Sequence, residues 1–156
     1  FWVGGWALAL IGLFNIIGTI YFGYLGDRLS KKYLLTLLYS LRGLLFLVFI
    51  FLPKTELTVL VFACILGILW LSTVPLTSGI ITVVFGPYYM SMLYGIAFLS
   101  HQVGSFLGSW LGGRLFDMYG SYELMWWICV ALGFIAAAMH IPIVEKPVQR
   151  EILNKV

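Results

Sequence analysis

Apolar runs of about twenty residues constrain this chain more than any other feature of its sequence. Five such runs can be delimited, at about residues 1–26, 33–52, 57–85, 90–116 and 122–144. A helix rises about 1.5 Å per residue, so each run is long enough to cross a hydrocarbon core of about 30 Å. The alternating ten-residue segments of a membrane β-barrel are absent, and a backbone in lipid must satisfy its own hydrogen bonds. The sequence therefore predicts an all-α, polytopic transmembrane helix bundle of five spans, followed by a polar cytoplasmic tail over residues 145–156.

The composition argues against soluble classes of protein. Hydrophobic residues make up 62% of the chain and charged residues 10%, whereas an average soluble domain has about 45–50% and 25%. The net charge of +3 comes from Lys and Arg scattered at the ends of the apolar runs, which implies a lipid bilayer and no nucleic acid as partner. Cys64 and Cys129 lie inside apolar runs, where we expect small buried hydrophobic side chains. The sequence shows no constellation typical of a catalytic site, a metal site or a cofactor site, so we predict that the protein is not an enzyme.

Basic residues indicate how the spans are oriented. They gather in the loop after the first run and in the tail, whereas the opposite loops offer only Lys54 and Arg114. The two basic groups are Arg28, Lys31 and Lys32, and then Lys146, Arg150 and Lys155. Positive loops stay on the cytoplasmic side. Five spans put both groups on that side.

An internal repeat appears when the chain is aligned with itself at an offset of 90 residues. The first run then matches the fourth, and both end in Gly-x-Leu-x-Asp; the matched pairs include Gly5 with Gly95, Gly18 with Gly108, Gly23 with Gly113, and Asp27 with Asp117. An offset of three helices gives the two copies opposite orientations, which is the inverted repeat of many secondary transporters. The repeat also places the partner of the third span before residue 1, which predicts a further helix there.

The loop after the first run carries the most specific motif. It resembles the signature of the major facilitator superfamily, G-x-x-x-D-R-x-G-R-(K/R), at Gly23, Asp27, Arg28, Lys31 and Lys32. Ser30 stands where the family prefers glycine, which implies a less sharp turn. The resemblance implies that the five spans are helices eight to twelve, and that helix seven and a six-helix N-terminal half are missing. A carboxylate at a helix C-terminus is unfavourable for the helix dipole, so Asp27 should seek a cationic partner and act as a conformational latch.

The fourth run resembles bacterial members of the superfamily near the monocarboxylate porters and the oxalate/formate antiporters. The similar stretch is 94–108, together with the Gly-x-Leu-x-Asp ending. This resemblance implies a small organic anion, such as a monocarboxylate, as the solute, and the bacterial inner membrane as the location. The antiporters have a lysine in this helix that meets the substrate carboxylate, and this run has none.

Arg42 and His101 are ionisable residues placed well inside apolar runs. A charge in mid-membrane costs about 2.5–3.5 kcal/mol on insertion scales, so Arg42 must be compensated. Arg42 has one of two roles. In the functional role it binds an anion or takes part in gating, and in the structural role it makes an interhelical ion pair or hydrogen bonds to carbonyls. Histidine changes its charge between pH 5 and 8, so His101, beside Gln102, either couples transport to protons or is a neutral residue bonded to Ser105 or to a facing helix.

Two further groups of residues are candidates. Thr73 and Thr77 flank Pro75, which should kink the third span and expose polar groups to a transport path. A stripe of small residues follows one face of the fourth run, at Ser100, Gly104, Gly108 and Gly112. Such a stripe lets helix backbones approach closely, and we expect it to serve packing before ligand binding.

These features together predict the C-terminal part of a secondary transporter that moves a small solute by alternating access. The alternatives are a membrane protein that only packs helices into an assembly, and a passive channel.

Overall fold

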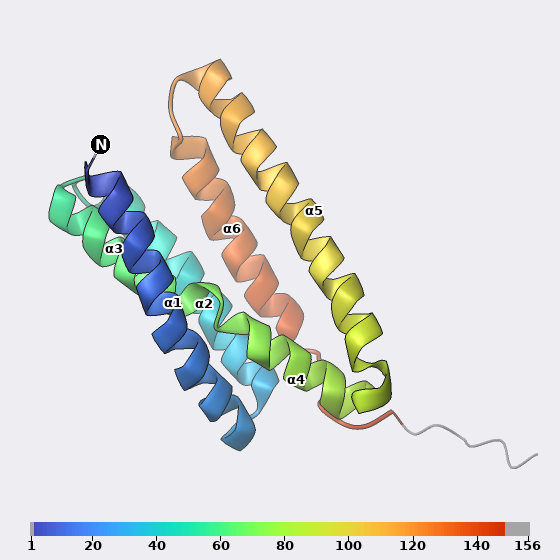
Figure 1. Cartoon of the computed structure of the whole chain (residues 1–156). Coiled ribbons are helices and arrows are strands. Elements are labelled where there is room, and N and C mark those ends of the chain that lie inside the picture. The colour runs from blue at the N-terminus through green and yellow to red at the C-terminus, as the bar shows by residue number, and fades with distance from the viewer. Residues whose placement is uncertain (1, 149–156) are drawn as a thin grey trace, which may run out of the picture.

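A computed structural model describes residues 2–148, and in this range it consists of α-helices and loops without a strand (Figure 1). The predicted all-α fold is confirmed. The helices are α1 (Trp2–Arg28), α2 (Lys31–Phe51), α3 (Glu56–Trp70), α4 (Thr73–Phe85), α5 (Pro87–Tyr119) and α6 (Glu123–His140). Arg150 and Lys155 of the predicted tail lie outside the described residues.

Two of the helix ends differ from the limits of the predicted spans. The run at 57–85 forms two helices, α3 and α4, which together are one stretch long enough to cross a membrane. In the run at 122–144, the helix ends at His140, because Pro142 has no amide to donate to the carbonyl four residues before it.

Four stretches of the described chain are long and apolar enough to cross a membrane: α1, α2, α3 with α4, and α6. α5 is outside this set, although its 33 residues extend over about 50 Å. Serine, glycine, histidine and glutamine replace aliphatic residues along it and lower its hydropathy. The fifth span expected at 90–116 therefore stays a prediction.

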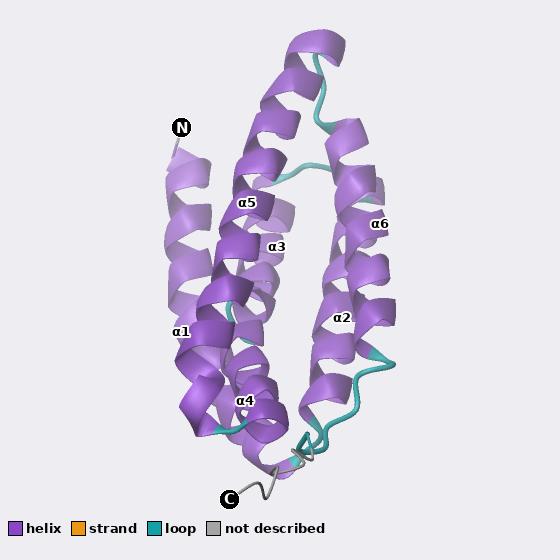
Figure 2. Ribbon diagram, turned by 90° about the vertical axis from the view of Figure 1, so that its right-hand side faces the viewer, coloured by secondary structure: helices purple, strands orange, loops and turns teal. Residues whose placement is uncertain are grey.

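The helices pack in two pairs, α1 along α3 and α2 along α6 (Figure 2). Glycines lie where each pair crosses. A Cβ at Gly18 would overlap the backbone of Ile68, and a Cβ at Gly67 would lie 2.7 Å from the carbonyl oxygen of Ile11. In the other pair, a Cβ at Gly133 would lie 2.9 Å from Cα of Gly43. Both pairings therefore depend on backbone contact that only glycine permits.

The core is divided between two clusters that share α2 and α3. The first joins these two helices to α1 and α4 through Phe22, Leu34, Leu35, Leu38, Leu69 and Leu76. The second joins them to α6 through Phe46, Leu66 and Val130. α2 and α3 therefore lie at the centre of the packed part of the chain.

The segment 141–148 folds back over the basic start of α2 and the C-terminal end of α4. The carboxylate of Glu145 accepts a hydrogen bond from the backbone amide of Lys32, in the first turn of α2. Lys32 Nζ donates to the carbonyl oxygen of Ile141 at 3.4 Å. The amide of Val148 donates to the carbonyl of Val84 at 2.9 Å. These bonds bring the first loop and the start of the tail together at one end of the bundle.

α5 lies at the edge of the bundle and contacts α4 and, more lightly, α6 (Figures 1 and 2). Gly112 is its one buried residue. Gly108, the repeat counterpart of Gly18, would meet nothing within 4 Å if it carried a Cβ. The face of α1 around Gly18 therefore packs against α3, whereas the corresponding face of α5 around Gly108 has no neighbour within the described chain.

Candidate functional site

The third apolar run is interrupted at Leu71 and Ser72, between α3 and α4. The sequence predicted a kink at Pro75, and the break lies about one turn earlier. The proline ring clashes with the carbonyl four residues before it, which belongs to Leu71, and proline has no amide to bond that carbonyl. Pro75 itself lies in the first turn of α4, where proline is tolerated.

Side chains from two neighbouring helices bond the backbone groups freed at this junction. Arg42 Nη2 of α2 donates to the carbonyls of Leu69 at 2.6 Å and Trp70 at 3.0 Å. The side-chain oxygen of Asn15 in α1 accepts the amide of Leu71 at 3.0 Å. The hydroxyl of Ser72 donates to the carbonyl of Ile68. No water competes for such groups in a bilayer core, so these side chains make the break tolerable there.

Arg42 is held by aromatic rings as well as by these carbonyls. Its guanidinium lies 5.0 Å from the ring centre of Tyr39 and 5.7 Å from that of Trp70. Its Nε is buried without a hydrogen-bond partner among the described residues. Of the two roles considered for Arg42 from the sequence, this geometry favours the structural one, in which carbonyl groups compensate the charge.

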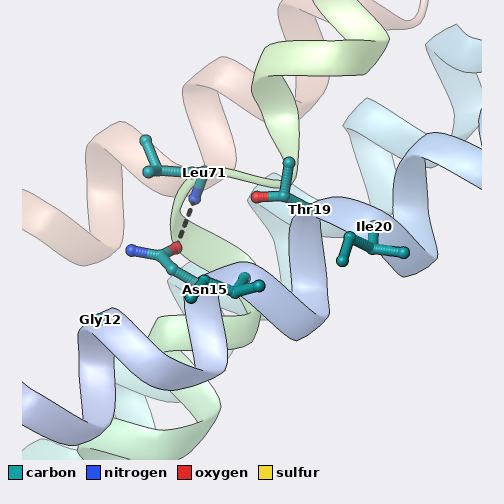
Figure 3. A pocket seen from close by; sticks show the side chains of 6 residues that line it. Gly12, Asn15, Thr19, Ile20 and Leu71 are labelled. Atoms are coloured by element: carbon teal, nitrogen blue, oxygen red, sulfur yellow. Dashed lines mark hydrogen bonds between the residues drawn. The ribbon is translucent and has the colours of Figure 1, made fainter.

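An open hollow of about 410 Å³ lies on α1 beside the junction (Figure 3). Its lining residues are Gly12, Asn15, Ile16, Thr19, Ile20 and Leu71. Because the oxygen of Asn15 faces the Leu71 amide, the side-chain NH₂ points away from Leu71 (Figure 3). Thr19 adds a hydroxyl to the same hollow. The site thus combines hydrogen-bonding groups with an apolar wall.

A second hollow, of about 430 Å³, lies at the basic end between α1, α2 and α4. It is lined by Gly23, Gly26, Asp27, Lys31, Pro75, Ser78, Gly79, Thr82 and Val83. Three of the five signature residues, Gly23, Asp27 and Lys31, therefore face α4. The other two stack on tyrosines instead: Arg28 lies 4.5 Å from the ring centre of Tyr24 and Lys32 4.8 Å from that of Tyr33.

The remaining predicted site residues are not brought together. Thr77 donates to the carbonyl of Thr73 at 2.8 Å and Thr73 to that of Trp70 at 3.4 Å, and neither lines a hollow described above. His101 and Gln102 are exposed on α5. The serine at 105 bonds the backbone carbonyl of His101 at 3.0 Å, so the expected bond between this serine and the imidazole is not formed.

Sequence reasoning missed Asn15. It is the only amide side chain in the first apolar run, and this isolation in an otherwise apolar helix was the available signal. Polar groups inside membrane spans are costly and mark either interhelical bonds or solute paths. Asn15 makes an interhelical hydrogen bond to Leu71 and also lines the hollow on α1.

Comparison with known proteins decides the family. The family described as the Major Facilitator Superfamily matches residues 3–155. The chain belongs to this superfamily. The resemblance seen in the signature loop is thereby confirmed, and the apolar helices are those of an integral, multi-pass membrane protein.

Two curated relatives are each 30% identical to this superfamily member. One is the uncharacterized MFS-type transporter YcxA of Bacillus subtilis strain 168, matched over 92% of the chain and 37% of its own length. The other is monocarboxylate transporter 12 of Homo sapiens, matched over 81% of the chain and 27% of its own length. The chain thus spans about a third of the length of these relatives. No solved structure matches the chain.

Proposed function

We propose that the chain forms the C-terminal part of a secondary transporter of the bacterial inner membrane that moves a small solute by alternating access. The observation that carries the proposal is the hollow beside a broken helix. In many transporters, interrupted helices place backbone and polar side chains at the solute site. The partial coverage of both relatives and the bare face of α5 support a missing N-terminal half that packs against this chain.

We propose a small organic anion, such as a monocarboxylate, as the solute. Asn15 and Thr19 offer hydrogen-bond donors for its oxygen atoms, while Ile16 and Ile20 offer an apolar wall for a short carbon chain. A relative at 30% identity is named a monocarboxylate transporter. None of the six residues lining this hollow is charged, so hydrogen bonds would carry the recognition on this half.

Counterflow in vesicles tests the transport activity. The complete protein, reconstituted in liposomes preloaded with unlabelled L-lactate, is expected to accumulate labelled L-lactate transiently and with saturation. Flux that rises linearly with concentration would indicate a passive channel. Flux equal to that of protein-free vesicles for lactate, pyruvate and butyrate would indicate a helix-packing protein or another solute class, and would contradict the proposal.

We also propose that His101 couples transport to protons. Its imidazole lies near the middle of α5, exposed, with Phe98 as its ring neighbour at 6.1 Å and no ion pair to a described residue. Glutamine keeps hydrogen-bonding capacity but does not titrate, so His101→Gln is expected to flatten the dependence of initial uptake rate on pH between about 5 and 8. The control is Gln102→Ala, which should keep the dependence. An unchanged pH profile in His101→Gln would exclude His101 as the coupling residue.

A further inference from the structure

Of the six described residues that line the α1 hollow, Asn15 is the one whose side chain bonds the backbone at the α3–α4 junction (Figure 3). Leu71 is the residue that follows α3, and its amide donates to the side-chain oxygen of Asn15. The two residues are 56 positions apart in sequence. The bond therefore ties the middle of α1 to the point where the third run breaks.

The two ends of the Asn15 amide have different tasks. The oxygen must face the Leu71 amide, because an N–H group needs an acceptor, and this leaves the NH₂ group to face other partners. Thr19 lies four residues later, on the same side of α1, and lines the same hollow. A solute oxygen held between these two side chains would accept a hydrogen bond from Asn15 while Asn15 holds Leu71.

We infer that Asn15 is a positioning residue that transmits occupancy of the hollow to the α3–α4 junction. Hydrogen bonds in a chain polarise one another, so a solute that accepts from the NH₂ group strengthens the bond from Leu71 to the oxygen. The solute then favours the junction geometry in which that bond is made, and α4 is held more firmly relative to α3. This inference rests on the proposed function, since it requires a solute in the hollow.

Besides the packing of α1 on α3 at Gly18, the one hydrogen bond from α1 to the junction among the described residues is that of Asn15 to Leu71. Arg42 bonds Leu69 and Trp70 from α2, on the other side of the break. Ser72 bonds within its own run. Asn15 thus makes the hydrogen-bonded link between the hollow and the junction, beside Leu71, which belongs to the junction and lines the hollow itself. α4 extends from the junction to the second hollow, where Ser78 faces the signature residues Asp27 and Lys31.

Labelling of a cysteine on α4 tests the inference. In the complete protein with Cys64 and Cys129 replaced by serine, Ser78→Cys is reacted with a small maleimide, with and without L-lactate. Saturating lactate is expected to slow the labelling about fivefold or more, the lower range of typical coupling between sites. Counterflow of lactate is measured on the same preparation, so an absence of transport is distinguished from an absence of coupling.

Two variants separate binding from coupling. Thr19→Val removes a donor without touching Leu71, so it should raise the half-saturating lactate concentration on the order of tenfold and keep the full labelling response at saturation. Asn15→Ala should abolish the response at every lactate concentration. Asn15→Leu keeps the approximate volume of the side chain and loses both the acceptor and the donor, so it should show no response at any lactate concentration, even if the alanine variant fails to fold.

Three outcomes would overturn the inference. Asn15 would be only a binding residue if the response of Asn15→Ala or Asn15→Leu returned at high lactate, as expected for Thr19→Val. It would be only structural if either variant kept the parent's half-saturating concentration and response. Counterflow without any change in Ser78→Cys labelling would refute the coupling and leave the proposed transport intact.

Discussion

Replacing Arg42 with methionine is expected to destabilise the protein while leaving solute affinity unchanged. The guanidinium bonds two carbonyls at the break, at 2.6 and 3.0 Å, and each bond from a charged donor contributes about 1.5–3 kcal/mol. Methionine removes the cost of a mid-membrane charge, about 2.5–3.5 kcal/mol. The bonds outweigh that cost, and the net loss should be on the order of 2 kcal/mol because two carbonyls lose their partner.

Denaturant unfolding of the purified protein in detergent measures this loss, and counterflow measures the half-saturating concentration of L-lactate. Arg42→Lys should recover part of the stability, since ammonium donates to carbonyls but lacks the planar stacking of guanidinium on Tyr39 and Trp70. Arg114→Met is the matched control, because Arg114 is an exposed arginine within a helix. If Arg42→Met instead kept its stability and weakened lactate binding tenfold, Arg42 would belong to the anion site.

The helices could be predicted from the sequence because their ends are encoded locally. Pro53 and the Gly86-Pro87 pair stop or start helices by their own backbone chemistry. The apolar length between such breakers is fixed by the bilayer. The position of the break in the third run was harder to predict, since it depends on which carbonyls find a partner. Arg42 supplies that partner from 27 and 28 positions away.

The candidate site could be predicted only in part. The signature residues Gly23, Asp27 and Lys31 were identified because they form a short motif, and the structure places them at one hollow. Asn15 and Thr19 form a site only because α1 packs against the junction between α3 and α4. The sequence around these two residues does not indicate that packing. His101 attracts attention as an isolated histidine, yet it lies on α5, which does not line the hollow beside Asn15.

Changing Gly18 to alanine is expected to destabilise the protein, although a change from glycine to alanine usually stabilises a helix. In an exposed helix interior, alanine is favoured over glycine by roughly 0.5–1 kcal/mol. At Gly18 the added Cβ would overlap the backbone of Ile68, and a backbone in a packed helix cannot rotate away as a side chain can. Overpacking of this kind costs about 1–3 kcal/mol, so the apparent melting temperature should fall.

Gly5→Ala is the control on the same helix, because a Cβ at Gly5 would meet nothing within 4 Å in the described chain. Its melting temperature should stay constant or rise. Gly18 also lies one turn from Asn15, so displacing α1 from α3 should lengthen the bond between Asn15 and Leu71 and reduce the response of Ser78→Cys labelling to lactate. Equal melting temperatures for Gly18→Ala and Gly5→Ala would show that the α1–α3 contact does not require glycine. A lowered melting temperature with a full labelling response would show that the junction is held independently of this helix crossing.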